Sequence, residues 1–310
     1  MDAIVIERLT KTYRPTWPWQ QPSTVLSEVS LTVGRGEIFG FLGPNGAGKT
    51  TTMKILLGLM RATSGSAEVL GAPSGDVNVH KQIGYLPESP YFYDYLTAEE
   101  FLVFYGRLAG LDKVELQRRV PLLLDRVGLT EAHSRPLRKF SKGMLQRIGL
   151  AQALIHDPEL VILDEPMSGL DPVGRKDVRD IILSLRDQGK TVFFSTHIIS
   201  DVEMICDRVG ILAKGRVLAM GRIEDLVNRH AAQSVEVVCE GLVGEEVPLI
   251  RSTAVRLLQR GDRCWMIIPG QNRLEEVLAA IRQAGGRLIS VIPHKGSLEE
   301  IFLEQTNRQV

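Results

Sequence analysis

The sequence predicts an α/β protein built around a phosphate-binding loop, followed by a smaller α/β domain. Three observations support this prediction. A glycine-rich segment, residues 43–50, lies between a short apolar run and an apolar pattern with helical spacing. Two further apolar runs, 160–163 and 191–195, end in polar residues, as parallel strands do beside a site. After about residue 228 the composition changes, and short segments with strand-like alternation follow.

The length and composition are those of a globular chain. Its 310 residues are 44% hydrophobic and 24% charged, which suits one large domain and a small one. The 37 Lys and Arg residues balance the 37 Asp and Glu residues, which argues against a protein that wraps nucleic acid. The three cysteines lack metal-site spacing and fit a reducing compartment. No apolar run approaches the roughly 18 residues of a membrane span, and we expect no signal peptide.

The chain is expected to begin with two strands. Residues 3–9 and 25–33 have strand character, and the Pro- and Trp-rich residues 14–22 between them predict a loop whose tryptophans pack within it. Tyr13 follows the first strand. It either offers a flat aromatic face to an adenine ring or closes the edge of the strand, and the sequence leaves both interpretations open.

Residues 43–50 fit the pattern G-x-x-x-x-G-K-[ST] of a phosphate-binding loop. A predicted strand over 37–42 and a predicted helix over 50–59 give the motif its required context. The glycines let backbone N–H groups turn toward the α- and β-phosphates, and the helix N-terminus adds further donors. Lys49 is expected to reach the β- and γ-phosphates, and the Thr50 hydroxyl to ligate Mg²⁺. The sequence therefore predicts a nucleotide site here.

A mainly helical insert is expected over about residues 97–156. The strand before it, 83–86, stops abruptly and leaves Glu88 at its exit, where polar side chains often face a site. Thr97 and the acidic residues after it form a capping box, and Asp112 is expected to cap a second helix. The insert therefore interrupts the α/β core without ending it.

Two later strands supply the candidate catalytic residues. The apolar strand over 160–163 leads into Asp164 and Glu165, a pair that suggests a metal-organising carboxylate and a base that activates water. A solvated acidic turn is the alternative, and the apolar run before the pair argues against it. His197 follows the strand over 191–195. Because parallel sheets place their sites beyond the carboxyl ends of strands, we interpret this histidine as functional.

With these motifs in place, residues 1 to about 225 resemble the nucleotide-binding subunit of an ABC transporter. The segment 43–50 matches the Walker A motif of that family, 160–164 its Walker B motif and 168–171 its D-loop. The resemblance implies an ABC-type P-loop NTPase core with an antiparallel β subdomain and a helical subdomain. The implied nucleotide-binding residues are Tyr13, Gly43, Pro44, Asn45, Gly46, Ala47, Gly48, Lys49, Thr50 and Thr51, with Glu165 and His197 as catalytic residues, Thr50, Glu88 and Asp164 as metal ligands, and Asp171 in the D-loop.

The signature sequence of the family corresponds to residues 140–144, which depart from Leu-Ser-Gly-Gly-Gln at three positions. In such proteins two ATP molecules lie between head-to-tail subunits, and the signature of one subunit contacts the nucleotide of the other. The implied contact residues are Ser141, Lys142, Gly143 and Met144. From the residues alone, the serine is only a helix N-cap. Similar signatures, and a Glu where the family usually has Gln at position 88, occur in the exporter-type (ABC-2) branch.

The second domain is predicted over 229–310, after a first domain over 1–228. We expect it to contain a hairpin whose arms are 254–258 and 263–268, an amphipathic helix over 273–284 and a strand over 287–292. A final helix begins after Ser297. Its sequence resembles the tail of exporter-type ATPases, in which such extensions dimerise or regulate; alternatively, the domain merely covers the core.

The resemblance implies an Mg-dependent ATPase at the cytoplasmic face of a bacterial cell membrane. Its implied partners are an integral membrane permease and a second copy of itself or a paralogous ATPase subunit, with no nucleic acid, and ATP-driven dimerisation would power export. The aromatic residues within 91–95 are either the contact for the permease or buried beneath the helical insert, and we expect contact. A soluble ABC ATPase acting on ribosomes or DNA would need a second such domain or long coiled coils. A scaffold without hydrolysis would lack the catalytic residues, which are present here.

Overall fold

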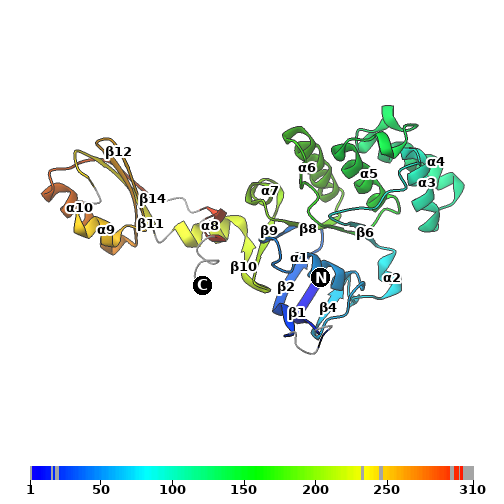
Figure 1. Ribbon diagram of the computed structural model, residues 1–310, viewed down its shortest axis with the longest axis horizontal. Coiled ribbons are helices and arrows are strands. Elements are labelled where there is room, and N and C mark those ends of the chain that lie inside the picture. Colours follow the sequence, from blue (N-terminus) through cyan, green and yellow to red (C-terminus); the bar gives the residue numbers. More distant parts are fainter. Residues whose placement is uncertain are drawn as a thin grey trace. The chain divides into compact units, whose positions relative to one another are not determined.

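The computed structural model divides the chain into two compact units, Met1–Gly221 and Arg222–Val310 (Figure 1). It describes residues 2–14, 17, 21–231, 234–243, 247–293, 297–299 and 301–302. The division falls before helix α8 (Ile223–Ala231), which contacts strand β11 (Ser234–Glu240) and therefore groups with the second unit. The sequence instead placed the boundary after residue 228.

The first unit contains two sheets. A six-stranded sheet has the strand order β10-β9-β3-β8-β7-β6, and a four-stranded sheet has the order β2-β1-β4-β5. Within the larger sheet, β9, β3, β8, β7 and β6 pair in parallel. The bounds are β1 (Asp2–Tyr13), β2 (Ser23–Gly34), β3 (Ile38–Leu42), β4 (Ser64–Val69), β5 (Ala72–Pro73), β6 (Ile83–Leu86), β7 (Leu160–Leu163), β8 (Thr191–Thr196), β9 (Arg208–Ala213) and β10 (Arg216–Arg222).

Helices cover both faces of the larger sheet (Figure 1). Helices α5, α6 and α7 lie over one face, and α1 together with the antiparallel sheet lies over the other. Side chains alternate along each strand, so Val161 packs into one core and Ile162 into the other. The helices of this unit are α1 (Lys49–Leu56), α2 (Val77–His80), α3 (Ala98–Leu108), α4 (Lys113–Arg126), α5 (Lys142–Leu154), α6 (Pro172–Asp187) and α7 (Ile199–Ile205), with short 3₁₀ turns η1 (Thr130–Ala132) and η2 (Leu137–Lys139).

The helical insert begins as the capping pattern predicts. Thr97 Oγ1 accepts a hydrogen bond from the Glu100 N–H at 3.2 Å, and the Glu100 carboxylate accepts from the Thr97 N–H at 2.9 Å. The bond from the Thr97 N–H, and secondarily one from the Thr97 hydroxyl at 3.0 Å, stabilise the charged carboxylate and lower the pKa of Glu100. Asp112 makes the equivalent box with Glu115 at the start of α4. Both boxes satisfy N–H groups that the first turn leaves without helical partners.

Four adjacent parallel strands bring the predicted site residues to one edge. The register pairs Leu42 of β3 with Thr196 of β8, and Leu163 of β7 with both Phe194 of β8 and Leu86 of β6. The four strands therefore end within two residues of one another, with β3 and β8 extending furthest. The phosphate-binding loop, His197, the carboxylate pair and Glu88 each follow one of these ends, so the predicted parallel α/β core is confirmed.

The second unit has a β-α-β-β-α-β order with an all-antiparallel sheet, β12-β13-β11-β14. Its further elements are α9 (Pro248–Thr253), β12 (Arg256–Arg260), β13 (Arg263–Pro269), α10 (Gln271–Gln283) and β14 (Arg287–Pro293). The predicted hairpin is present, with its first arm two residues further along the chain. The end of the predicted final helix lies outside the described residues. Within the described part of the chain, no helix is long and apolar enough to cross a membrane.

Candidate active site

The loop between β3 and α1 is held in a shape that only glycine permits at two positions. The Gly43 N–H donates to the Thr196 carbonyl at 3.1 Å, and a Cβ at residue 43 would collide with the Leu212 carbonyl. Gly48 has φ of +112° and caps α1, and a Cβ there would press against Leu26. The loop therefore delivers its backbone N–H groups and the N-terminus of α1 to the same open space.

Lys49 is the cation at the centre of this loop. Its side chain is only 6% exposed, and its ammonium donates to the Gly43 carbonyl at 2.6 Å and to the Pro44 carbonyl at 3.3 Å. The same ammonium lies 3.1 Å from Oε1 of Glu165. A buried ammonium is thus balanced by one carboxylate and two carbonyls.

The Glu165 carboxylate joins the loop to the end of β8. Its Oε2 lies 2.9 Å from Nδ1 of His197, and its other oxygen faces Lys49. The glutamate is 6% exposed, whereas the histidine side chain is 41% exposed. Glu165 therefore sits between a buried cation and a solvent-accessible imidazole.

Ser195 links the Asp164 carboxylate to the backbone of Glu165, and the sequence reasoning missed it. Its Oγ donates to Asp164 Oδ1 at 2.6 Å and accepts from the Glu165 N–H at 2.9 Å, and the residue is fully buried. Glu165 has φ of +50°, a left-handed conformation that costs a non-glycine residue energy. The serine thus fixes a strained backbone turn. The only available signal was its position directly after the apolar residues 192–194, at the polar end of the strand.

Asp164 has one oxygen free for a cation. Its Oδ2 is buried and has no hydrogen-bond partner among the described residues. No group of three or more His, Cys, Asp or Glu side chains suited to a metal occurs in the described chain. This donor set fits Mg²⁺, which usually takes one or two carboxylates and completes its shell with water and substrate phosphates.

A cavity of about 470 Å³ lies over the loop, within the size range of small-molecule sites. It is lined by Val25, Pro44, Asn45, Gly46, Gly48, Lys49, Thr50, Thr51, Glu88 and Glu165. Tyr13 does not line it; the residue is 40% exposed, and its hydroxyl donates to Met60 Sδ at 3.3 Å. Burial, and secondarily the charge of Asp164, raise the pKa of nearby Tyr85 to about 12, so that phenol stays neutral.

Comparison with known proteins identifies the family. The family model described as ABC transporter matches residues 26–168. An ABC transporter ATP-binding protein of Synechocystis sp. is 47% identical over 98% of this chain and 85% of that protein. The chain belongs to the ABC transporter ATP-binding family. The Nod factor export ATP-binding protein I of Rhizobium sp. is 36% identical over 92% of this chain and 93% of that protein.

A solved ATP-binding subunit of an ABC transporter has the same fold. It superposes with a TM-score of 0.64 at 34% identity, over 74% of this chain and 93% of that one. The resemblance inferred from the motifs is therefore confirmed, and with it the fold class. The protein is an ATP-binding subunit of an ABC transporter.

The ABC signature and D-loop residues do not line the chain's own phosphate cavity, as far as the structure describes it. Ser141 caps α5, with Oγ accepting from the Met144 N–H at 3.3 Å. Asp171 caps α6, with Oδ1 accepting from the Gly174 N–H at 3.0 Å. The Lys142 side chain lies against Gly169, so the two helix N-termini are neighbours.

The aromatic segment after β6 divides into two kinds of residue. Tyr91 is 82% exposed and Tyr95 is 64% exposed. Phe92 is partly buried, packs against the core and stacks at a tilt on Phe101 with ring centroids 5.5 Å apart. The expectation that this segment as a whole forms a contact surface therefore fails at Phe92, whose ring belongs to the core of the helical insert.

Proposed function

We propose that this ABC subunit hydrolyses Mg-ATP within a head-to-tail dimer and thereby powers export through a separate membrane permease. The observation that carries the proposal is the placement of the buried Glu165 carboxylate between Lys49 and His197, beside the phosphate-binding loop. A general base needs to lie within hydrogen-bond reach of a water at the phosphate and to be held by a third group. Glu165 lines the cavity over the loop, where that water would lie, and His197 contacts it, which supports the proposal.

When ATP binds, the ammonium of Lys49 would leave the Glu165 carboxylate and pair with the phosphates. The ammonium now pairs with Glu165 at 3.1 Å. The β- and γ-phosphates carry more negative charge than one carboxylate, so ATP would draw the ammonium away. Glu165 then loses its cation and becomes available as a base, still held by His197. The lysine thus couples the arrival of ATP to the release of the base.

Hydrolysis follows from the freed carboxylate. Glu165 accepts a proton from water, the water oxygen bonds to the γ-phosphorus, and the bond from that phosphorus to the bridging oxygen of ADP breaks. His197 positions the carboxylate through its 2.9 Å contact with Oε2. Mg²⁺ bound at Thr50, Glu88 and Asp164 would supply charge neutralisation at the phosphates.

We propose a dimer because the signature and D-loop residues do not line the phosphate cavity of their own chain, as far as the structure describes it. The Ser141 to Met144 segment would complete the nucleotide site of a second subunit, which is a second copy of this chain or a paralogous ATPase. Backbone N–H groups at the start of α5 would then face the γ-phosphate. Asp171 would lie at the same interface.

We assign the permease contact to Tyr91 and Tyr95, which are exposed in the segment that follows strand β6 and Glu88. Exposed tyrosines are frequent interface anchors. Export is favoured because the relatives include a protein named for Nod factor export. The subunit would then sit at the cytoplasmic face of a cell membrane.

Purification of the tagged full-length chain from detergent-solubilised membranes tests this function. A stoichiometric integral membrane protein in the complex, and Mg-dependent ATP turnover, are expected. Tyr91→Ala should reduce recovery of that partner, whereas Leu59→Ala, with a side chain 68% exposed elsewhere on the surface, should not. Recovery with ribosomes or DNA in place of a membrane protein would favour the soluble class of ABC ATPase.

A further inference from the structure

Arg147 joins three helices of the first unit. It lies on α5, and its Nη1 donates to the Val127 carbonyl at 3.1 Å and the Gly128 carbonyl at 3.4 Å, at the end of α4. The same nitrogen lies 3.5 Å from Oδ2 of Asp177 on α6. One guanidinium therefore spans from the helical insert to a helix of the α/β core.

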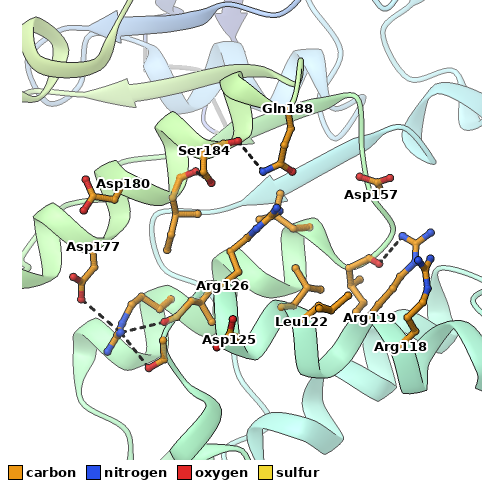
Figure 2. Close-up of a pocket in the computed structure, with 17 residues that line it drawn as sticks. Arg118, Arg119, Leu122, Asp125, Arg126, Asp157, Asp177, Asp180, Ser184 and Gln188 are labelled. Atoms are coloured by element: carbon orange, nitrogen blue, oxygen red, sulfur yellow. Dashed lines mark hydrogen bonds and ion pairs between the residues drawn. The ribbon is translucent and has the colours of Figure 1, made fainter.

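The bridge made by Arg147 lies at a cleft between helices α4 and α6. The walls formed by α4 and α6 are separated by an open cleft of about 780 Å³, and Asp177 stands at one end of it (Figure 2). Gly128 has φ of +63°, and a Cβ there would lie 2.9 Å from Arg147 Nη1. The α4 terminus thus approaches the guanidinium as closely as glycine allows. Arg147 and Asp177 both line this cleft, so the bridge spans it at that end.

The two bridged helices begin at the residues assigned to the dimer interface. Ser141 caps α5 and Asp171 caps α6. Arg147 and Asp177 each stand six residues after their cap, which is about 9 Å at 1.5 Å per residue. Because a helix transmits displacement along its axis, a tie at this level restrains the offset between the two N-termini.

We propose that Arg147 is a positioning residue that holds the signature end of α5 in register with the D-loop end of α6, so that both meet a second subunit together. The inference rests on the proposed ATP-driven dimer. Arg147 touches neither nucleotide nor reacting atoms in this arrangement. Its Nε is buried without a hydrogen-bond partner in the described structure, so the guanidinium is held through Nη1 alone among the bonds that the structure shows.

Loss of the Arg147 bridge should weaken dimerisation and leave nucleotide binding by one subunit unchanged. A dimer forms only when the N-termini of α5 and α6 are in the required register in both subunits; the competent fraction is the share of subunits that have this register. The dimer dissociation constant therefore scales with the inverse square of the competent fraction. If loss of the tie lowers that fraction from nearly all to about a third in each subunit, the constant rises about tenfold. The phosphate cavity does not include Arg147, so ATP affinity of the monomer is expected to stay within about twofold.

Sedimentation of the full-length chain with Mg-ATP measures this effect in a Glu165→Gln background, where turnover does not consume the nucleotide. Arg147→Met removes the whole tie and keeps the aliphatic stem. Asp177→Asn removes the ion pair and retains the bonds to the α4 carbonyls, which guards against a folding defect. The two substitutions should combine less than additively, because they break one bridge.

Arg186→Met is the matched control. Arg186 lies on the same helix, α6, and pairs with Asp207 at 3.4 Å, but it does not contact α5 among the interactions that the structure shows. Arg186→Met should lower the midpoint of urea unfolding about as much as Arg147→Met does, and it should leave the dimer dissociation constant unchanged. Titration of a fluorescent ATP analogue into each variant checks that the monomer site is intact.

An approximately tenfold weaker dimer in Arg147→Met, a smaller effect in Asp177→Asn and none in Arg186→Met would support the inference. A dimer constant within twofold of the parent, or an equal loss in Arg186→Met, would overturn it while leaving the proposed function standing. If the Glu165→Gln parent itself stays monomeric with Mg-ATP, the proposed dimer fails, and the positioning role falls with it.

Discussion

Removal of the Ser195 hydroxyl tests whether the strand β8 organises the catalytic carboxylates. Ser195→Ala takes a donor from Asp164 Oδ1, now at 2.6 Å, and an acceptor from the Glu165 N–H, now at 2.9 Å. Both groups are buried, so water cannot replace the hydroxyl without rearrangement. The Asp164 carboxylate would then retain no hydrogen bond that the structure shows.

The expected cost follows from these two bonds. A hydrogen bond to a charged group contributes about 1.5–3 kcal/mol, and a buried unsatisfied N–H costs about 1–3 kcal/mol. The unfolding free energy of the first unit should therefore fall by about 2–4 kcal/mol, since the terms overlap. Glu165 is also released from its strained turn at φ +50°, which misplaces the base and should lower kcat at least tenfold.

Urea unfolding followed by circular dichroism gives the stability, with the two units fitted as separate transitions. Ser184→Ala is the control, because that hydroxyl donates only to the Ile181 carbonyl within its own helix at 2.7 Å. It should cost less than about 1 kcal/mol and leave turnover unchanged. A Ser195→Ala variant as stable and active as the Ser184→Ala variant would refute the account of these carboxylates.

Three further substitutions test separate parts of the account. Lys49→Ala should weaken ATP binding or abolish turnover, because it removes the ammonium that contacts the β- and γ-phosphates; retention of both would contradict the site assignment. Glu88→Gln should keep turnover, because the amide retains an oxygen acceptor, and complete inactivity would show that the charge is required. A hydrogen bond from Lys190, whose ammonium lies 2.6 Å from Asp157, lowers the pKa of that carboxyl from 3.8. The pair therefore stabilises the fold above about pH 4 and loses this contribution as pH falls through the folded-state pKa. Lys190→Gln should accordingly lower unfolding free energy by under about 1 kcal/mol at pH 7 and by less at about pH 3, whereas an equal loss at both values would exclude the ion pair as its cause.

Local sequence patterns predicted the elements that depend on neighbouring residues. The capping box at Thr97, the helix cap at Asp112 and the loop at 43–50 are encoded within a few positions, so they followed from spacing alone, although the full box that Asp112 makes with Glu115 was not predicted. The alignment of β3, β8, β7 and β6 was also predictable, because buried apolar runs that end in polar residues are typical of a parallel sheet.

Features that depend on packing between distant segments were not predictable. Ser195 lies 31 positions from Asp164, and nothing in its own strand indicates that contact. Tyr91 and Phe92 are adjacent aromatics, yet only the ring of Phe92 meets Phe101. The role of Arg147 likewise depends on the ends of two other helices, so it emerged only with the fold.

Turnover of Glu165→Gln tests the central claim most directly. Under saturating Mg-ATP the variant should bind nucleotide with an affinity close to that of the unchanged chain, because Lys49 and the loop backbone are retained. Its hydrolysis rate should fall at least roughly a hundredfold, the scale of one general-base contribution. Near-normal hydrolysis by a variant that binds ATP normally would contradict the assignment of Glu165 as the base and the mechanism built on it.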